Sequence, residues 1–358
     1  MKKKLFIPGP VEVSADVFAA MSNPMVGHRM PEYAELHKSV TTQLQSLLHT
    51  DEPVFLSTSS AFGIMEGAVR NLVQKRCANF GNGAFSTKWH DVTKRCGIEA
   101  DLFTTEWGEP ITPEMVDEAL SSGKYDAMTM VHNETSTGVM SPLASIAEVM
   151  QKYPDVSFIV DTVSSMSAVT IDFSALGMDV CLAGVQKAFG LPPGLAVCAV
   201  SRKALEKAKT TPNRGYYFDF EEFEKNDLKH NTPSTPCISL IYGMDAQLKK
   251  MFTEGLQQRY ERHARMAGMT REWARRHGFE LFAAEGYASM TLTSVRNTRT
   301  VDLEGIKKTL GERGYAMDNG YGKIKNETFR IPHMADMQPA DLDEYFAVLE
   351  EALPPVDP

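Results

Sequence analysis

The chain has 358 residues, of which 43% are hydrophobic and 23% are charged, and its formal net charge at pH 7 is −9. A chain of this length is too long for one small core and suggests two domains, or one large domain with a smaller companion. The negative charge argues against nucleic acid or an anionic membrane as the main partner, because either would need a basic face.

The opening residues and the cysteines indicate the compartment. The start MKKKLFIPGP is basic, but its apolar run covers only Leu5 to Ile7, which is too short for an export signal. No apolar stretch approaches the ~18 residues of a membrane span. The five cysteines are odd in number and scattered, with no close pair that resembles a metal site. We therefore expect a cytoplasmic protein with reduced thiols, without a membrane span or a metal ion.

Prolines and glycines shape the first part of the chain. A Pro-Gly-Pro sequence predicts an irregular opening segment, after which Ser14 can cap a helix that starts at Ala15. Gly27, His28 and Arg29 lie between two prolines and therefore on a loop. A solvated basic pair is the favoured interpretation of His28 and Arg29, and part of an anion pocket is the functional one.

The next stretch combines a short strand with a turn of small hydroxyl residues. Apolar spacing predicts a helix from Pro31 to His49, then a strand at 54–56, a turn at 57–63 and a helix from Ile64 onward. The free N–H groups and the dipole at such a helix start make an anion site, to which the hydroxyls of residues 58–60 can add donors. A simple capped connection is the alternative.

The middle of the chain alternates strands and helices. Strands are predicted at 77–80 and 100–104, in AMTMV, and in VSFIVD, which ends at Asp161. Helices are predicted at 87–96, 113–121 and 143–152. This alternation predicts an α/β fold with a mostly parallel sheet covered by helices on both faces, and with ligands at the carboxyl ends of the strands.

One lysine stands out in the stretch from Asp179 to Ala199, DVCLAGVQKAFGLPPGLAVCA. Two apolar runs around a Gly-Leu-Pro-Pro-Gly turn predict strand, loop and strand, and Lys187 lies between them. A buried amine has a depressed pKa and becomes a nucleophile, so Lys187 is a candidate Schiff-base lysine. The alternative is a lysine that merely ends a strand.

The residues at the predicted strand ends suggest one cofactor. They are a buried lysine, an acid, hydroxyl donors at a helix start and an aromatic ring, found at Lys187, at Asp161, at 58–60 and at Phe85. Pyridoxal phosphate needs these parts, because the lysine forms an imine, the acid keeps the pyridine nitrogen protonated and the helix start holds the phosphate. Phe85 could supply the flat partner of the ring.

After Leu205 the character of the chain changes. Residues 208–236 are polar and aromatic with three prolines, and we expect a long excursion that reaches a neighbour or covers the site. An interrupted helix is predicted from Ile238 to His277. Its arginines at 259, 262, 265, 271, 275 and 276 are interleaved with acidic residues, which favours a solvated helix face over a binding patch.

The C-terminal part has the pattern of a small α+β domain. Strands are predicted at 287–294 and 328–331 and helices at 302–313 and 339–353. We expect a segment at 1–15 that contacts both domains, a large cofactor-binding domain at 16–245 and a small domain at 246–358. Arg330 faces away from Phe329 and Ile331 in its strand. It can bind a substrate carboxylate or form a structural ion pair.

The chain resembles class V, fold-type I aminotransferases of the alanine–glyoxylate, serine–glyoxylate and serine–pyruvate group. The matching pieces occur in family order and span nearly the whole chain. They are PGPVEV, GHRMPEY, STSSAFGIMEGAV, NGAFS, HNETSTGV, VDTVSS, GVQKAFGLPPGLA, TPSTPCISLIYG and FRIPHMAD.

This resemblance implies a role for each matching residue. Lys187 would form the Schiff base with pyridoxal phosphate, and Asp161 would pair with the pyridine nitrogen. Val163 and Phe85 would pack on the two ring faces, and Thr135 would reach the phenolic oxygen. The phosphate would be surrounded by Ser59, Ser60, Ala61, Phe62 and Gln186. The substrate would be bound by Arg330, Gly27, His28 and Arg29. The family also implies a homodimer with shared active sites, in which Thr232 or Thr235 completes the partner's phosphate site.

The implied reaction is transfer of an amino group from a small L-amino acid, alanine or serine, to glyoxylate or pyruvate. Lys187 would be nucleophile and general acid/base together. One alternative is an anionic substrate such as phosphoserine or a phosphonate, because phosphoserine aminotransferases carry a pair similar to His28 and Arg29. A pyridoxal phosphate-dependent lyase is another, although a desulfurase would need a mobile cysteine and none follows Gly243. A dehydrogenase is disfavoured because no Gly-x-Gly-x-x-Gly follows the first strand.

Overall fold

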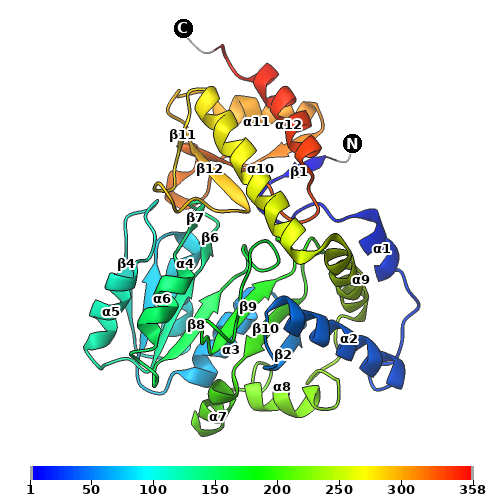
Figure 1. The fold of residues 1–358 in the computed structure, drawn as a ribbon, viewed down its shortest axis with the longest axis vertical. Coiled ribbons are helices and arrows are strands. Elements are labelled where there is room, and N and C mark those ends of the chain that lie inside the picture. Colours follow the sequence, from blue (N-terminus) through cyan, green and yellow to red (C-terminus); the bar gives the residue numbers. More distant parts are fainter. Residues whose placement is uncertain (1–2, 356–358) are drawn as a thin grey trace.

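The computed structural model describes residues 3–355, so residues 1–2 and 356–358 of the predicted first and last domains lie outside the described residues (Figure 1). Its largest sheet has the strand order β2-β10-β9-β8-β5-β3-β4. Only β10 runs against the others. The strands are β2 (Val54–Ser57), β3 (Cys77–Gly81), β4 (Ala100–Thr104), β5 (Ala127–Val131), β8 (Ser157–Asp161), β9 (Val180–Gly184) and β10 (Ala196–Val200).

Helices cover both faces of this sheet because successive residues of its strands, which point to opposite faces, are apolar. In β8, Phe158 and Val160 join one core cluster while Ile159 joins another, as the two-residue period of a strand requires. The first cluster contains residues of α1 (Ala15–Met21), α2 (Pro31–Leu47), α5 (Pro113–Ser121), α6 (Leu143–Met150) and α9 (Ile238–Glu254). The second contains residues of α3 (Ala61–Leu72), α4 (Ala84–Arg95), α7 (Arg202–Thr210) and α8 (Phe220–Asp227). The predicted fold class is confirmed.

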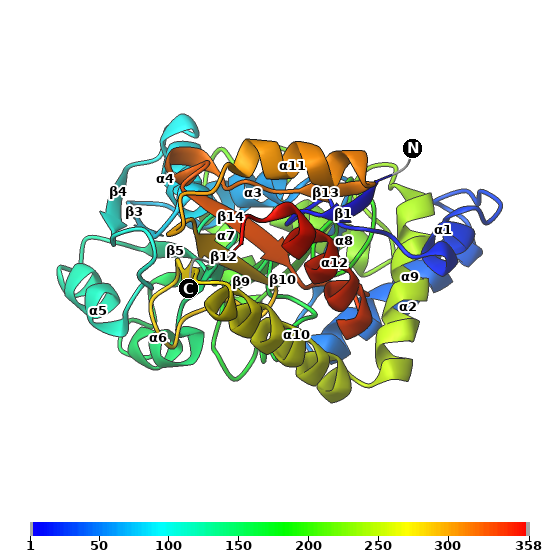
Figure 2. The same cartoon turned by 90° about the horizontal axis from the view of Figure 1, so that it is seen from above.

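The C-terminal elements form a separate core around Trp273, whose ring stacks on Phe346 at a centroid distance of 5.1 Å. Seen from above, α10, α11 and α12 lie over the strands of the large sheet (Figure 2). These elements are β11 (Glu280–Leu281), β12 (Leu292–Arg296), β14 (Thr328–Pro332), α10 (Leu256–Arg276), α11 (Leu303–Glu312) and α12 (Pro339–Ala352). Shorter pieces are β6 (Asn133–Glu134), β7 (Val139–Met140), β13 (Tyr315–Met317) and a 3-10 helix at Gly322–Ile324. The predicted domain limits stay a prediction.

The opening segment is irregular at residues 7–14, as predicted, but an unexpected strand precedes this stretch. Strand β1 (Lys4–Phe6) pairs in parallel with β13, and Phe6 stacks on Tyr345 at a centroid distance of 3.9 Å. The partners of this short apolar run lie more than 300 residues away. The strand was not predicted because local pattern carries no information about such a distant pairing.

Two helices of the large sheet begin three residues earlier than predicted. Helix α3 starts at Ala61 and not Ile64, and α4 starts at Ala84 and not Thr87. The residues that precede them give no local cap, since neither Ser60 nor Gly83 makes a side-chain capping bond. Consequently Ala61, Phe62 and Phe85 lie in first helical turns, where backbone N–H groups have no acceptor within the helix.

The region after β10 also differs in part from the prediction. The expected interruption of the long helix is found at Gly255, whose φ of +90° separates α9 from α10. The excursion at 208–236 contains the helix α8. The prediction that the arginines form a solvated face is wrong for Arg259, which has no exposed surface. It holds only in part for Arg262 and Arg271, which are half-buried. Within residues 3–355, no helix is long and apolar enough to span a membrane.

Candidate active site

Lys187 lies in the loop between β9 and β10, at the carboxyl end of β9. The loop is closed on itself, since Gly190 N–H donates to the Lys187 carbonyl at 2.9 Å and Leu191 N–H to the Val185 carbonyl at 3.0 Å. Among residues 3–355 the amine has no hydrogen-bond partner, and the Phe85 ring centroid lies 5.7 Å from Nζ. Burial and then the charge of Arg330 lower the pKa of Lys187 to about 8, against the attraction of Asp161. The side chain is still partly exposed, so the amine is an accessible nucleophile.

Asp161 ends β8, the parallel neighbour of β9. Only 3% of the residue is exposed, and its carboxylate accepts one backbone N–H, from Val163, at 2.9 Å. Burial raises the pKa of Asp161 to about 7, and the negative charge of Glu134 adds to this rise. A carboxyl group with so few donors gains most from a cationic partner brought by a ligand.

Thr135 belongs to the polar loop after β5 and lies next to the loop that follows Asp161. Its hydroxyl is 2.5 Å from that of Ser164, and both residues are buried. His132 Nδ1 makes a similar contact with the Ser165 hydroxyl at 2.9 Å, and burial lowers the pKa of His132 to about 4. Sequence reasoning gave Ser164 no role. The available signal was that Ser164 lies three residues after Asp161, in a stretch rich in hydroxyl residues.

The N-terminus of α3 is open. Ser60 is exposed and makes no capping bond, and no acceptor among the described residues is recorded for the N–H groups of Ala61 and Phe62. The Ser59 hydroxyl contacts that of Ser57 at 2.9 Å. Gln186 packs against Gly184 so closely that a Cβ there would lie 2.7 Å from its Oε1. Free N–H groups and the helix dipole make this place an anion site.

Phe85 lies in the first turn of α4, which is held by Glu134. This fully buried carboxylate accepts the N–H of Ser86 at 2.7 Å, that of Phe85 at 3.4 Å, and the N–H and hydroxyl of Ser136 at 3.0 and 2.7 Å. The ring of Phe85 stacks on Tyr321 at a centroid distance of 5.1 Å. Sequence reasoning missed both Glu134 and Tyr321, although Glu134 lies in a motif that it did quote.

Arg330 lies in β14 and reaches the same site. Its Nε and Nη2 each donate to Asp318 at 2.7 Å, and Nη1 donates to the Thr135 carbonyl at 2.8 Å. The predicted structural ion pair is therefore present. Of the five N–H groups of a guanidinium, two remain for a further acceptor, so the ion pair leaves room for the predicted carboxylate contact.

The N-terminal segment crosses this site. Val11 N–H donates to the Gln186 carbonyl at 3.2 Å. Gly9 has a φ of +136°, and a Cβ at this position would lie 2.8 Å from Cδ of Lys187. The close approach requires glycine for both reasons.

Five predicted residues lie apart from these groups. Gly27, His28 and Arg29 are in the loop between α1 and α2 at the outer edge of the molecule (Figure 1), and Arg29 is exposed. Thr232 is buried, and its hydroxyl donates to the Ser234 carbonyl at 2.7 Å, whereas Thr235 is exposed. Across the described residues, none of them has a recorded contact with Lys187, Asp161 or Arg330.

Comparison with known proteins gives one consistent result. The sequence model of the family described as aminotransferase class-V matches residues 14–324. The chain is 31% identical to a serine–glyoxylate aminotransferase of Arabidopsis thaliana and 30% identical to an L-aspartate–glyoxylate aminotransferase of Paracoccus denitrificans. Each match covers 94% of this chain and 87% of the relative. The structure resembles that of an alanine–glyoxylate aminotransferase from Nostoc sp., with a TM-score of 0.93, 26% identity and coverage of 99% and 96% of the two chains.

Proposed function

The chain belongs to the class V aminotransferase family and is a pyridoxal phosphate-dependent aminotransferase, and we propose that it moves an amino group from a small L-amino acid to glyoxylate or pyruvate. The observation that carries this proposal is the unpartnered Lys187 amine, which lies over Phe85 at the strand end next to Asp161.

The residues present fit pyridoxal phosphate. The amine of Lys187 is free to hold the cofactor covalently. The Asp161 carboxyl accepts one backbone hydrogen bond and could accept another from a pyridinium N–H. The open N-terminus of α3, with Ser59, Ser60, Ala61 and Phe62, would hold the phosphate together with Gln186. Phe85 and Val163 would pack on the ring, and Thr135 with Ser164 would contact its phenolic oxygen.

The cofactor, when bound, supplies an electron sink for the negative charge that develops at the substrate α-carbon. The Asp161 carboxylate stabilises a proton on the ring nitrogen and so strengthens that sink. Lys187 Nζ, once released, takes the α-proton and returns it, as a general base and acid whose pKa of about 8 lies near working pH. The two free N–H groups of Arg330 would hold the substrate carboxylate.

The choice of substrates rests on the relatives. Two of them are named for glyoxylate as acceptor, and their donors are serine and aspartate. This supports glyoxylate as the acceptor here, with alanine, serine and aspartate as the donors to compare. The phosphoserine alternative has weaker support, because the phosphoserine aminotransferases that the structure resembles are at most 24% identical to it and show the fold alone. The lyase alternative is not favoured, and the cysteine desulfurase neighbour is 11% identical.

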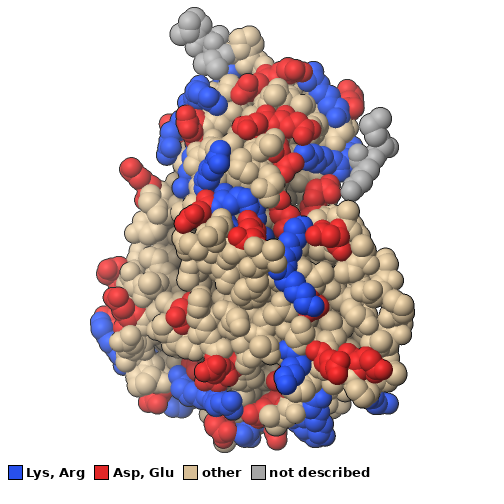
Figure 3. Space-filling view, turned by 45° about the vertical axis from the view of Figure 1, so that its right-hand side comes forward, with Lys and Arg blue, Asp and Glu red and all other residues tan. Residues whose placement is uncertain are grey.

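A homodimer with shared sites is part of the proposal. Exposed large apolar residues occur in the α1–α2 loop and after α7, at Met25, Met30, Tyr216 and Tyr217, and on α1 and α3 at Phe18 and Phe62. Figure 3 shows a broad area with few charged residues in the lower half of the molecule, above its charged lower end. Because Thr232 is committed to its own turn, Thr235 is the residue we assign to the partner's phosphate. The five free cysteines support a reducing compartment, the cytoplasm.

The lysine assignment is tested by chemistry on the protein. Borohydride reduction of the cofactor-loaded protein followed by peptide mass spectrometry should place the pyridoxyl group on Lys187. Lys187→Ala should lose the visible cofactor absorbance and transamination with every donor. Label on another lysine, or full activity of the variant, would contradict the proposal.

The shared site is tested by mixing subunits. Lys187→Ala and Thr235→Asp should each be inactive as pure dimers. A refolded mixture should regain about one quarter of wild-type activity, because half of the dimers then carry one intact site. No recovery, or a monomer by light scattering, would contradict the shared dimer.

A further inference from the structure

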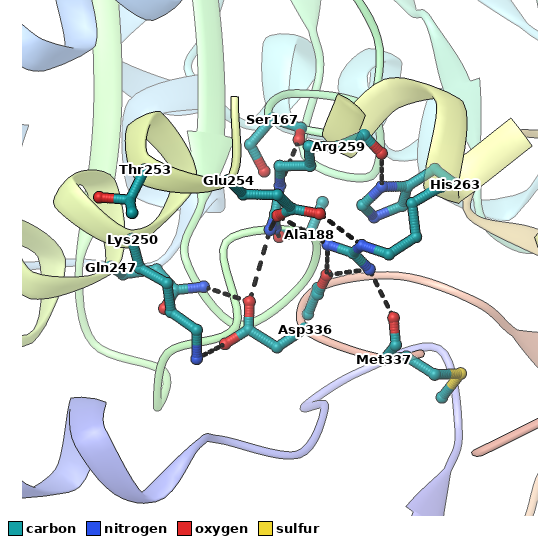
Figure 4. Close-up of polar contacts among 12 residues, drawn as sticks. Ser167, Ala188, Gln247, Lys250, Thr253, Glu254, Arg259, His263, Asp336 and Met337 are labelled. Atoms are coloured by element: carbon teal, nitrogen blue, oxygen red, sulfur yellow. Dashed lines mark hydrogen bonds and ion pairs between the residues drawn. The ribbon is translucent and has the colours of Figure 1, made fainter. Parts of the chain in front are cut away.

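A buried guanidinium joins the two loops that carry Asp161 and Lys187. Arg259 lies in the first turn of α10 and has no exposed surface. Its Nε donates to the Ser167 carbonyl at 2.9 Å, and its Nη2 donates to the Ala188 carbonyl at 2.8 Å (Figure 4). Ala188 directly follows Lys187, and Ser167 lies six residues after Asp161 in the segment that connects β8 to β9. The side chain of Arg259 therefore fixes the distance between the two loops.

The surroundings of Arg259 leave this cross-link little freedom. Ala168 and Ala188 pack in one small apolar cluster with Val11, Leu292 and Met334, so water does not compete for the two carbonyls. A guanidinium can donate in two directions from a rigid plane, whereas the single nitrogen of a lysine cannot reach both carbonyls in the same way.

The backbone of Ser167 is strained where its carbonyl accepts the hydrogen bond from Arg259. Its φ is +73°, a left-handed conformation that non-glycine residues rarely adopt, and its buried hydroxyl has no hydrogen-bond partner among the described residues. A strained conformation persists only where its surroundings hold it. Here the Ser167 carbonyl points at Nε of Arg259.

The other side of the guanidinium faces two acids. Nη1 lies 3.3 Å from Glu254 and 3.4 Å from Asp336, which balance the buried charge. Asp336 also accepts hydrogen bonds from Gln247 at 2.8 Å and Lys250 at 3.0 Å (Figure 4). Asp336 follows β14, the strand of Arg330. The cross-link is therefore anchored both to α9 and to the segment that leaves the substrate-binding strand.

We propose that Arg259 is a positioning residue that sets the place of Lys187 relative to Asp161 by binding the carbonyls of Ala188 and Ser167. This rests on the proposed function only in that Lys187 and Asp161 are taken as the reacting groups. Arg259 touches neither the substrate nor the cofactor, so its effect passes through the backbone next to Lys187.

The chain offers a matched control on the same helix. Arg262 donates to Glu254 at 2.6 Å and to the carbonyls of Ala335 and Met337, and no hydrogen bond to either loop is recorded for it within residues 3–355. The test variants are Arg259→Lys, which keeps the buried charge, and Arg259→Gln, which keeps a donor without it. The control is Arg262→Lys. All are compared at a temperature where their unfolding curves show them folded.

The first readout uses the cofactor-free protein. A trace of an amine-acetylating reagent is applied across pH, and the labelling of Lys187 is measured by peptide mass spectrometry. With the loop released, the ammonium becomes better solvated. Arg259→Lys should therefore label Lys187 about twofold more slowly at pH 8, with a midpoint about 0.5 pH unit higher. The second readout is kcat, which should fall about tenfold with KM nearly unchanged. Arg262→Lys should match wild type in both.

The outcomes separate this proposal from the proposed function. Wild-type labelling of Lys187 in Arg259→Lys, or an equal effect of Arg262→Lys, would overturn the positioning role. Failure of both Arg259 variants to fold would assign the residue to core stability and would also overturn it. If the wild type transaminated no donor–acceptor pair, the proposed function would fail, while the labelling comparison would still decide whether Arg259 positions Lys187.

Discussion

Helices α3 and α4 begin at the same edge of the large sheet, yet their N-termini are in opposite states. The N–H groups at the start of α4 are taken by the buried carboxylate of Glu134. Those at the start of α3 have no such partner, and Ser60 makes no capping bond. Only α3 can accept an anion, because the start of α4 already holds the carboxylate of Glu134. The chain completes one helix start itself and leaves the other for a ligand.

The same contrast separates the two buried acids. Glu134 accepts four hydrogen bonds from within the chain, whereas Asp161 accepts one, from Val163. A buried carboxyl group with few donors favours its neutral form until a cation approaches. Asp161 and the start of α3, whose hydrogen bonding is incomplete, are thus the groups expected to contact the cofactor. Glu134 and the start of α4, which are bonded to each other, hold Phe85 in place.

The largest expected effect follows from removing the unsatisfied acid. Asp161→Asn keeps the shape of the side chain but cannot stabilise a protonated ring nitrogen. We expect kcat/KM for transamination to fall about 1000-fold, because charge stabilisation at the reacting centre is lost. Steady-state kinetics at equal cofactor content, checked by absorbance, measures this. Less than a tenfold loss would mean that Asp161 is not the ring partner.

Removing the satisfied acid should act on stability. Glu134→Ala leaves the start of α4 and Ser136 without their acceptor inside the protein, so we expect the free energy of unfolding to fall by about 3 kcal/mol. Urea unfolding of the cofactor-free protein measures it. Glu134→Gln, which keeps one acceptor oxygen, should lose less. Equal losses in the two variants would point to side-chain volume and not to the hydrogen bonds.

The raised pKa of Asp161 predicts a pH dependence of stability. Its pKa is about 7 in the folded chain, above the ordinary aspartate value of about 4, so between these values the folded state holds a proton that the unfolded state has lost. The free energy of unfolding of the cofactor-free protein should therefore fall as pH rises, by roughly 2 kcal/mol from pH 5 to 7, relative to Asp161→Asn.

Loading the cofactor sharpens that prediction. A ring N–H beside Asp161 supplies the missing cation, so the difference between wild type and Asp161→Asn over the same pH range should shrink. Urea unfolding at three pH values, with and without cofactor, checks this. If, in the absence of cofactor, the free energy of unfolding changed with pH equally in wild type and Asp161→Asn, the assignment of an unsatisfied carboxyl would be contradicted.

The smallest effect is expected from giving α3 the cap that α4 has. Ser60→Asp puts a carboxylate at the open N-cap, which should stabilise the cofactor-free protein by about 0.5 kcal/mol. The same carboxylate competes with a phosphate, so cofactor affinity should fall about tenfold in an absorbance titration. Ser60→Asn is the uncharged control and should bind nearly as wild type. Unchanged affinity of Ser60→Asp would move the phosphate away from α3.

Sequence reasoning predicted the strand ends that carry the proposed reacting groups, but it did not predict the residues that support them. Lys187 and Asp161 could be found because each follows a short apolar strand, and the alternation of strands and helices places such residues at one sheet edge. The helix starts at Ala61 and Ala84 were placed three residues late. The acid that caps α4 comes from a segment about 50 residues away, and no local signal announces it.

Arg259 shows the same limit more clearly. Its helix carries interleaved charges, which is typical of a solvated face, yet its side chain is buried against Ser167 and Ala188. Periodicity tells which residues share a face of a helix, but not what packs on that face. The pairing of β1 with β13 escaped prediction for a related reason, since a three-residue strand is decided by its partner.

By itself the sequence determined the α/β class, the strand ends and the residue types that meet there, because these follow from local hydrophobic period and turn chemistry. Only the tertiary structure decided which donors and acceptors are already used. It showed that Glu134 closes α4, that α3 and Asp161 stay open, and that Arg259 ties the loops of Asp161 and Lys187 together. Hydrogen-bond satisfaction depends on neighbours distant in the chain, and chain-distant neighbours become visible only after folding.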